Sequence, residues 1–172
     1  LRAIYDAKEQ GKVRAGGVST HSVKLTKDLL LHPEFEVVHP IFNRIGHGLI
    51  HGTIEQQKEN LKNLYNAGVG LFAMKPLGGG RLYKEFLESL EWIKNYKYKH
   101  SVAIGVKNKQ ELDVDIAIFE DNYSDEMEKT LQLTEKKLFY RRDLCAMCLK
   151  CVEFCQFGAI THDKKNDCIV IN

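Results

Sequence analysis

Four of the five cysteines of the chain lie in one short run near its C-terminus, Cys145-Ala-Met-Cys148-Leu-Lys-Cys151-Val-Glu-Phe-Cys155. Cysteines this close together cannot readily form unstrained disulfides, because disulfide geometry is demanding. Four thiolates that converge from one tight turn suit a metal, and this spacing is the one that holds a 4Fe-4S cluster. Zinc also takes four thiolates, but usually from two pairs separated by a longer loop. The spacing therefore predicts an iron–sulfur cluster, with zinc or free thiols as the alternatives.

The residues behind the run predict a short β-hairpin: a turn into a strand over 157–162, a polar turn over 164–167 and a second strand over 168–172. A cysteine loop followed by such a hairpin resembles one half of a bacterial-type ferredoxin. Two features depart from that pattern, because Gln156 stands where a proline normally follows and a second cysteine run is missing. The fourth ligand stays open between Cys155, Cys168 and a second run beyond Asn172.

Composition sets the broad class of the protein. The chain has 172 residues, a hydrophobic content of 44% and a net charge of +2, which suit one or two globular domains and give no argument for nucleic acid or membrane partners. Clustered free thiols indicate a reducing cytoplasm rather than secretion. The sequence opens at Leu1 directly in an amphipathic helix, so we expect the C-terminal part of a longer protein.

The elements that would position these residues follow a β/α rhythm from residue 1 to about 120. The pattern predicts strands over 13–20, 36–42, 69–75 and 101–106, with helices over 1–10, after Ser22, over 54–67, over 84–96 and after Asn108. Four strands separated by helices predict a parallel sheet with right-handed crossovers. In the charged segment 121–140, a helix after Ser124 would carry Met127, Leu131 and Leu138 between the β/α part and the cysteine part.

Three segments carry a resemblance to a known family. Residues 11–21, GKVRAGGVSTH, resemble the fifth barrel strand of aldo/keto reductases. Residues 73–80, AMKPLGGG, are similar to the seventh strand in the branch that carries a C-terminal iron–sulfur motif, and residues 105–112, GVKNKQEL, resemble the eighth-strand phosphate loop. The resemblance implies the C-terminal half of a (β/α)8 TIM barrel, strands 5–8, over 1–120. A connecting helix over 121–140 and a small α+β 4Fe-4S ferredoxin-like domain over 141–172 would follow.

The resemblance also implies an activity: hydride transfer between NADPH or NADH and a carbonyl compound, with the 4Fe-4S cluster relaying electrons or bracing the fold. The implied partners are a small-molecule carbonyl substrate, a redox protein such as a ferredoxin or flavoprotein, and the missing N-terminal half-barrel. In that family the catalytic Asp, Tyr, Lys and His come from the first half, so no catalytic residue is predicted here and the chain alone is not expected to turn over. The alternative is a ferredoxin-like electron-transfer module with a non-catalytic β/α scaffold.

The implied cofactor residues lie at strand ends, where active sites of parallel barrels form. Ser19 and Thr20 would hydrogen-bond a nicotinamide carboxamide, or would only cap the next helix. The glycines at 78–80 would let backbone amides approach a pyrophosphate, with charge from Lys75 or Arg81. The full predicted set is Ser19, Thr20, Met74, Lys75, Leu77, Gly79, Gly105 and Lys107.

Several positions depart from the family pattern. His39 stands where a glutamine often lies beneath the nicotinamide, and Met74 replaces a stacking aromatic residue. Glu111 replaces a basic residue that would pair with the adenosine 2′-phosphate, which leaves NADP and NAD both open, and Asp115 replaces an asparagine near the adenine. His47 and His51 have the four-residue spacing of metal ligands, but their glycine-rich surroundings indicate a solvent-exposed loop.

Overall fold

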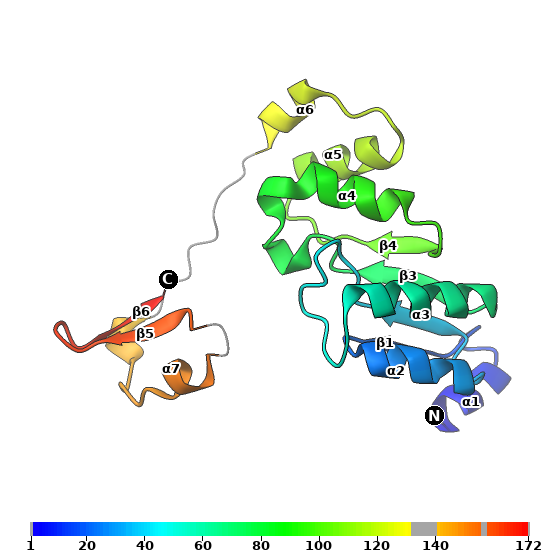
Figure 1. Cartoon of the computed structure of the whole chain (residues 1–172), viewed down its shortest axis with the longest axis horizontal. Helices are drawn as coiled ribbons and strands as arrows, with labels where there is room; N and C mark the ends of the chain where they lie inside the picture. The colour runs from blue at the N-terminus through cyan, green and yellow to red at the C-terminus, as the bar shows by residue number, and fades with distance from the viewer. Residues whose placement is uncertain (1, 132–140, 156–157, 172) are drawn as a thin grey trace. The chain divides into compact units, whose positions relative to one another are not determined.

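The computed structural model describes residues 2–131, 141–155 and 158–171. The chain divides into two compact units, Leu1–Leu133 and Thr134–Asn172, which are described separately (Figure 1). Within the described residues, no helix is long and apolar enough to cross a membrane.

The first unit is built on a four-stranded parallel sheet, whose strands are β1 (Gly17–Thr20), β2 (Val37–Pro40), β3 (Gly70–Met74) and β4 (Ser101–Ala103). The strands lie in the order β1-β2-β3-β4, as Figure 1 shows. Ser19 pairs with His39 and Phe72 pairs with Ser101, so the four carboxyl ends lie at one edge of the sheet. The predicted parallel sheet is therefore confirmed, and it is consistent with part of a β/α barrel.

Among the described residues of the first unit, the helices that accompany the strands are α1 (Arg2–Glu9), α2 (Val23–Asp28), α3 (Ile54–Asn66), α4 (Phe86–Asn95), α5 (Lys109–Phe119) and α6 (Asp125–Thr130). Short 3-10 turns cover Leu29–Leu31, Gly78–Gly80 and Tyr83–Glu85. Side-chain oxygens fix several helix starts. Ser22 Oγ accepts from the Leu25 amide at 3.1 Å, and Asn108 Oδ1 accepts from the Glu111 amide at 2.8 Å. Both caps satisfy amides that have no partner within the helix.

The core lies between one face of the sheet and the helices. Val38, Leu71 and Ala73 alternate along β2 and β3 and pack in one cluster with Leu64 of α3 and Leu90 of α4. Successive side chains in a strand point to opposite faces. His39, Phe72 and Met74 therefore lie on the other face, where they are half-buried. Parallel sheets are normally covered on both faces, and in a closed barrel this second face lines the interior.

An aromatic cluster joins the loop after β2 to α4. The ring of Phe42, which is fully buried, lies 4.9 Å from that of Trp92 and 4.7 Å from that of Tyr96. Tyr96 donates its hydroxyl hydrogen to the Lys58 carbonyl at 2.8 Å, and the Lys58 ammonium lies 5.6 Å from the centre of the Trp92 ring. Burial, and then the nearby Tyr98 and Glu59, raise the pKa of the Tyr96 phenol.

Two sequence predictions need correction in this unit. The first strand begins at Gly17 rather than at residue 13, at a crowded position where a Cβ on Gly17 would lie 2.4 Å from the Val37 carbonyl oxygen. The helix after Ser124 ends at Thr130 rather than continuing towards residue 140, and Met127 and Leu131 pack against the core of the first unit. Leu138, the third residue of that stripe, lies outside the described residues.

The second unit contains a 3-10 turn (Arg142–Leu144), α7 (Lys150–Phe154) and the strands β5 (Ile160–Asp163) and β6 (Cys168–Ile171). The strands pair antiparallel, with Asp163 opposite Cys168, which confirms the predicted hairpin. Asp163 Oδ1 accepts from the amides of Lys165 and Asn166 at the turn. Arg142 Nη2 donates to the Asn166 carbonyl at 3.0 Å and ties the residues before the cysteines to this turn.

Candidate functional site

The carboxyl edge of the first sheet gathers basic side chains. Lys75 follows β3 directly, and its Nζ lies 3.2 Å from Nε2 of His21, which follows β1. Because an ammonium only donates, Lys75 is the donor of this contact and Nε2 of His21 is the acceptor. Lys75 has a φ of 56°, a left-handed conformation that costs energy for a residue with a Cβ. The backbone is thus held in an unfavourable region at the point where the basic side chains meet.

The glycine-rich loop after Lys75 is open to a ligand. Gly78, Gly79 and Gly80 have φ values of 57°, 69° and 99°, which side chains with a Cβ rarely adopt. A Cβ on Gly79 would meet no atom within 4 Å, so the backbone there can be approached closely. The loop is held by the Gly78 amide, which donates to the Lys75 carbonyl at 2.9 Å. Arg81 follows directly and adds a second positive charge beside Lys75.

His47 belongs to this edge, although its sequence indicates only an exposed loop residue. Asn43, which is fully buried, accepts from the His47 amide at 2.8 Å and donates to its carbonyl at 2.9 Å. A Cβ on Gly78 would lie 3.7 Å from His47 Cβ. Burial, and then the charges of Arg81 and Lys75, lower the pKa of His47. The prediction of solvent exposure is therefore wrong for His47, which is half-buried against the glycine-rich loop.

His51, four residues further on, has a different role. It is exposed, and its Nδ1 lies 3.1 Å from Ser22 Oγ, the hydroxyl that caps α2. Across the described residues, no group of three or more His, Cys, Asp or Glu side chains is placed to hold a metal. His47 and His51 therefore contact different partners: the His47 backbone bonds to Asn43, and the His51 ring lies beside Ser22.

The face of the sheet opposite the core presents a second set of predicted residues. His39 Nδ1 lies 2.5 Å from the Phe72 carbonyl and must donate to it. The His39 ring stacks on that of Phe72 with centroids 3.8 Å apart. Ser19 is exposed and pairs with His39 in the sheet, so an imidazole and a hydroxyl lie side by side near the carboxyl edge.

Thr20 and Met74 are more enclosed than Ser19. Thr20 is buried, and its Oγ1 accepts from the Ser22 amide at 2.9 Å. This contact supports the turn into α2, the alternative that its sequence position left open. Met74 is half-buried at the end of β3, and its carbonyl accepts from the Phe42 amide at 3.0 Å. Leu77 is half-buried and packs against the core cluster, so it anchors the glycine-rich loop.

The predicted phosphate loop before α5 already holds a carboxylate. Glu111 Oε2 accepts from the Lys107 amide at 2.7 Å, and its Oε1 lies 3.7 Å from Lys107 Nζ. Gly105 and Lys107 are exposed. A carboxylate near a helix N-terminus is favoured by the orphan amides and by the helix dipole. A phosphate at this place would have to displace Glu111.

On the same helix, Asp115 is expected to lower stability at neutral pH. Burial, and then the charge of Glu111, raise the pKa of its carboxyl from 3.8 to about 6. Because the folded-state pKa is the higher one, its contribution favours folding below about pH 4 and is lost as the pH rises through 6. Asp115→Asn should therefore raise the free energy of unfolding at pH 7 by about 1 kcal/mol, a figure reduced for partial exposure.

The measurement is urea unfolding at pH 4.5 and pH 7. The control is Asp113→Asn, which removes a carboxyl from the same helix where the side chain is 50% exposed and pairs with Lys109. If the free energy of unfolding rose equally in the two variants, or equally at both pH values, the raised pKa of Asp115 would not be its cause.

The cysteine run carries its thiols on a turn and on helix α7, which contains Cys151. Cys148 and Cys151 are exposed, and Cys145, Cys155 and Cys168 are half-buried. Met147 and Leu149, which flank Cys148, have φ values of 49° and 59°. The donor types suit an iron–sulfur cluster. Their positions do not form an assembled ligand set, since the described residues bring no three such side chains together.

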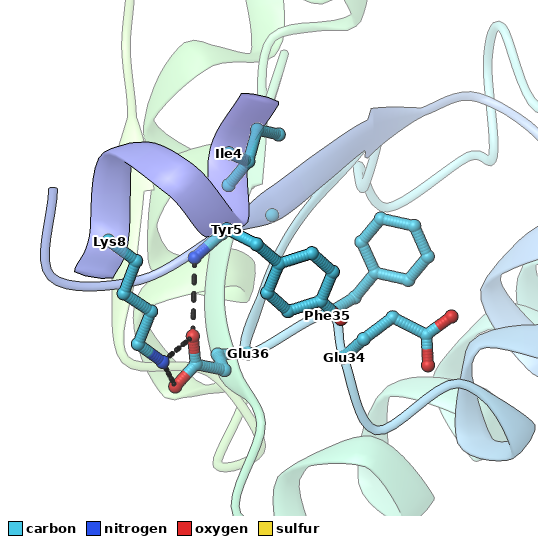
Figure 2. Close-up of a pocket in the computed structure, with 8 residues that line it drawn as sticks. Ile4, Tyr5, Lys8, Glu34, Phe35 and Glu36 are labelled. Atoms are coloured by element: carbon cyan, nitrogen blue, oxygen red, sulfur yellow. Dashed lines mark hydrogen bonds and ion pairs between the residues drawn. The ribbon is translucent and has the colours of Figure 1, made fainter. Parts of the chain in front are cut away.

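A small pocket lies at the opposite end of the strands and is closed by its own contacts. Ile4, Tyr5 and Phe35 line it together with Glu36, and Figure 2 shows the Glu36 carboxylate beside Lys8. The Lys8 ammonium lies 2.7 and 2.6 Å from the two oxygens of this carboxylate, and the Gly16 amide donates to it at 3.3 Å. The hydrogen bond from Lys8, and then that from Gly16, lower the pKa of Glu36. The ion pair between Lys8 and Glu36 therefore holds α1 against the end of the sheet that is opposite the basic edge.

A parallel β/α sheet with basic side chains and glycines in left-handed conformation at its carboxyl edge defines a protein of the β/α class. Residues 1–91, more than half of the chain, match the model of the aldo/keto reductase family. The chain belongs to the aldo/keto reductase family. No curated protein and no solved structure matched it.

Proposed function

We propose that the chain is part of an oxidoreductase that transfers a hydride between NADPH or NADH and a small carbonyl compound. Family membership supports the reaction class. The main support for binding of a nucleotide cofactor is the basic edge. There Lys75 and His21 lie close together beside three glycines in left-handed backbone conformation. Positive charge beside an open backbone is the arrangement that a pyrophosphate requires.

Different residues of the edge would bind different parts of the cofactor. Lys75 and Arg81 would neutralise the pyrophosphate, and the open backbone at Gly79 would let it approach. Ser19 and His39 would contact the carboxamide of a nicotinamide laid on the face of the sheet opposite the core. The nicotinamide supplies the hydride when it is bound. No residue of this chain is proposed as the proton donor, because the residues that fill this role in the family precede the matched strands.

The choice between NADP and NAD depends on Glu111. Its carboxylate is bonded to the Lys107 amide and would repel a 2′-phosphate, whereas it can accept from a ribose hydroxyl. We therefore propose that NAD is bound at least as well as NADP. Binding of NADP alone would contradict this choice.

The cysteine run is proposed to hold a 4Fe-4S cluster, which would place the protein in the iron–sulfur branch of the family. Support comes from the spacing of Cys145, Cys148, Cys151 and Cys155, from the exposure of Cys148 and Cys151, and from the hairpin behind them. The four side chains would have to converge when the cluster forms, as expected where metal binding is coupled to local folding. A ferredoxin or flavoprotein is the proposed redox partner, and an N-terminal half-barrel is proposed to cover the face of the sheet opposite the core.

Removal of the Lys75 charge tests the cofactor site. Lys75→Gln should weaken binding of NADH by about tenfold or more, because a charge-assisted contact to phosphate is lost. The dissociation constant is measured by the change in NADH fluorescence at low salt. The control is Lys62→Gln, which removes the same charge from α3, where Lys62 is partly exposed and pairs with Glu59. Equal loss in both variants would show that only net charge matters and would contradict a specific site.

A further inference from the structure

His47 occupies a position that the proposed cofactor site does not yet explain. Its backbone is fixed by both polar atoms of the buried Asn43 side chain, at 2.8 and 2.9 Å. The same loop is fastened at its far end, since the Ile50 amide donates to the His21 carbonyl at 3.0 Å and the Val23 amide donates to the Ile50 carbonyl at 2.9 Å. A histidine is thus held in place against Gly78 by contacts to two neighbouring strand ends.

We propose that His47 is a proton-linked ligand of the anion site at this edge, which takes up a proton when a phosphate group binds between Lys75, Arg81 and the glycine-rich loop. The proposal rests on the proposed binding of a nucleotide cofactor, and it adds a regulation of that site by pH. Neither the family match nor any motif in the sequence assigns a role to His47.

The sign of the linkage follows from the charges around the ring. Without an anion, burial and the charges of Arg81 and Lys75 lower the pKa of His47, so the imidazole is neutral at pH 7. A bound phosphate cancels those charges and provides an acceptor for the imidazolium N–H, which favours the charged ring. Anion binding therefore raises the proton affinity of His47, and by reciprocity a lower pH raises the affinity for the anion.

The other charged groups near His47 fit this assignment. On the β3 side the groups are Lys75, which contacts His21, and Arg81. Arg44, three residues before His47 in the same loop, is paired with Glu85 and Glu88, with Glu88 Oε2 at 3.2 Å from Nη2. The charges that act most on His47 are those of Arg81 and Lys75, and both are positive. A bound anion would offset the positive charges of Lys75 and Arg81 and so favour the protonated form of His47.

The test uses NAD⁺, whose pyrophosphate keeps its charge between pH 5.5 and 8, so that any pH dependence belongs to the protein. We expect the affinity of the full chain to rise as the pH falls, by at most about tenfold per pH unit for one linked proton. Calorimetry in two buffers of different ionisation enthalpy should show uptake of part of one proton at pH 7. His47→Gln should bind with a flatter pH profile and little uptake, and the control His51→Gln, in the same loop, should behave as the unmodified chain.

Each outcome distinguishes the two proposals. A pH slope and proton uptake that persist unchanged in His47→Gln would overturn the role of His47 and leave the cofactor site standing. They would assign the proton to another group of the edge, such as His21. An absence of binding of both NAD⁺ and NADP⁺ at every pH would overturn the cofactor site and the role of His47 together. Adenosine, which lacks phosphate, should show no proton uptake in either case.

Discussion

Protein prepared without oxygen is expected to contain about four irons per chain, and its Cys148→Ala variant almost none. Cys148 lies in the middle of the run, between two residues in left-handed conformation, and is exposed. Without its thiolate the proposed cluster loses one of its ligands. Because metal binding and local folding are coupled, the residues from 141 onward should also become more open to proteolysis. Iron content and the brown charge-transfer absorption measure the first effect, and limited proteolysis measures the second.

Two matched variants decide the fourth ligand and control for loss of any thiol. Cys155→Ser should lose iron as Cys148→Ala does, whereas Cys168→Ser should retain it, because Cys168 lies within β6 and pairs with Asp163 in the hairpin. Full iron in Cys155→Ser would reverse this choice. Colourless protein with stoichiometric zinc would contradict the cluster and favour a zinc site.

Phe42→Ala is expected to lower the free energy of unfolding of the first unit by about 3–5 kcal/mol. Phe42 is fully buried and its ring contacts those of Trp92 and Tyr96, so truncation leaves a cavity that α4 and the loop after β2 cannot easily close. Its amide also donates to the Met74 carbonyl, a contact that alanine retains. Urea unfolding should therefore show a lower midpoint without loss of the parallel sheet in the folded state.

Leu31→Ala is the matched control for this prediction. Leu31 lies in the 3-10 turn after α2 and is 79% exposed, so its removal should change the free energy of unfolding by less than about 0.5 kcal/mol. Similar decreases in the free energy of unfolding for Leu31→Ala and Phe42→Ala would show that the aromatic cluster does not stabilise the first unit.

The sequence was sufficient for the order and type of most elements because their signals are local. Apolar runs between helical segments, bounded by glycine and proline, predicted the four strands. The short polar residues Ser22 and Asn108 predicted the starts of α2 and α5, which their side-chain bonds confirm. Element ends were less accurate. The first strand is shorter than its hydrophobic pattern, and α4 begins at Phe86 because Lys84 and Glu85 belong to a 3-10 turn.

The candidate site was harder to predict because its key contacts join distant residues. Nothing in the loop from 43 to 52 indicates that Asn43 is buried and holds His47 against Gly78, since that contact depends on how two strand ends meet. The pairing of Lys75 with His21 spans more than fifty residues. Helix α7 was also not predicted, because the cysteine spacing dominates the local pattern there. The spacing of the cysteines indicates which metal centre suits them, but it does not predict the secondary structure of the residues between them.

The position of Trp92 makes the two units separately visible in optical experiments. It is the only tryptophan of the chain, and its ring lies in the first unit beside Phe42 and Tyr96. Tryptophan emission therefore reports the melting of the β/α unit alone, while the visible absorption of the proposed cluster would report only the cysteine unit. A single titration with denaturant, followed at both wavelengths, would show whether the two units unfold together or one after the other.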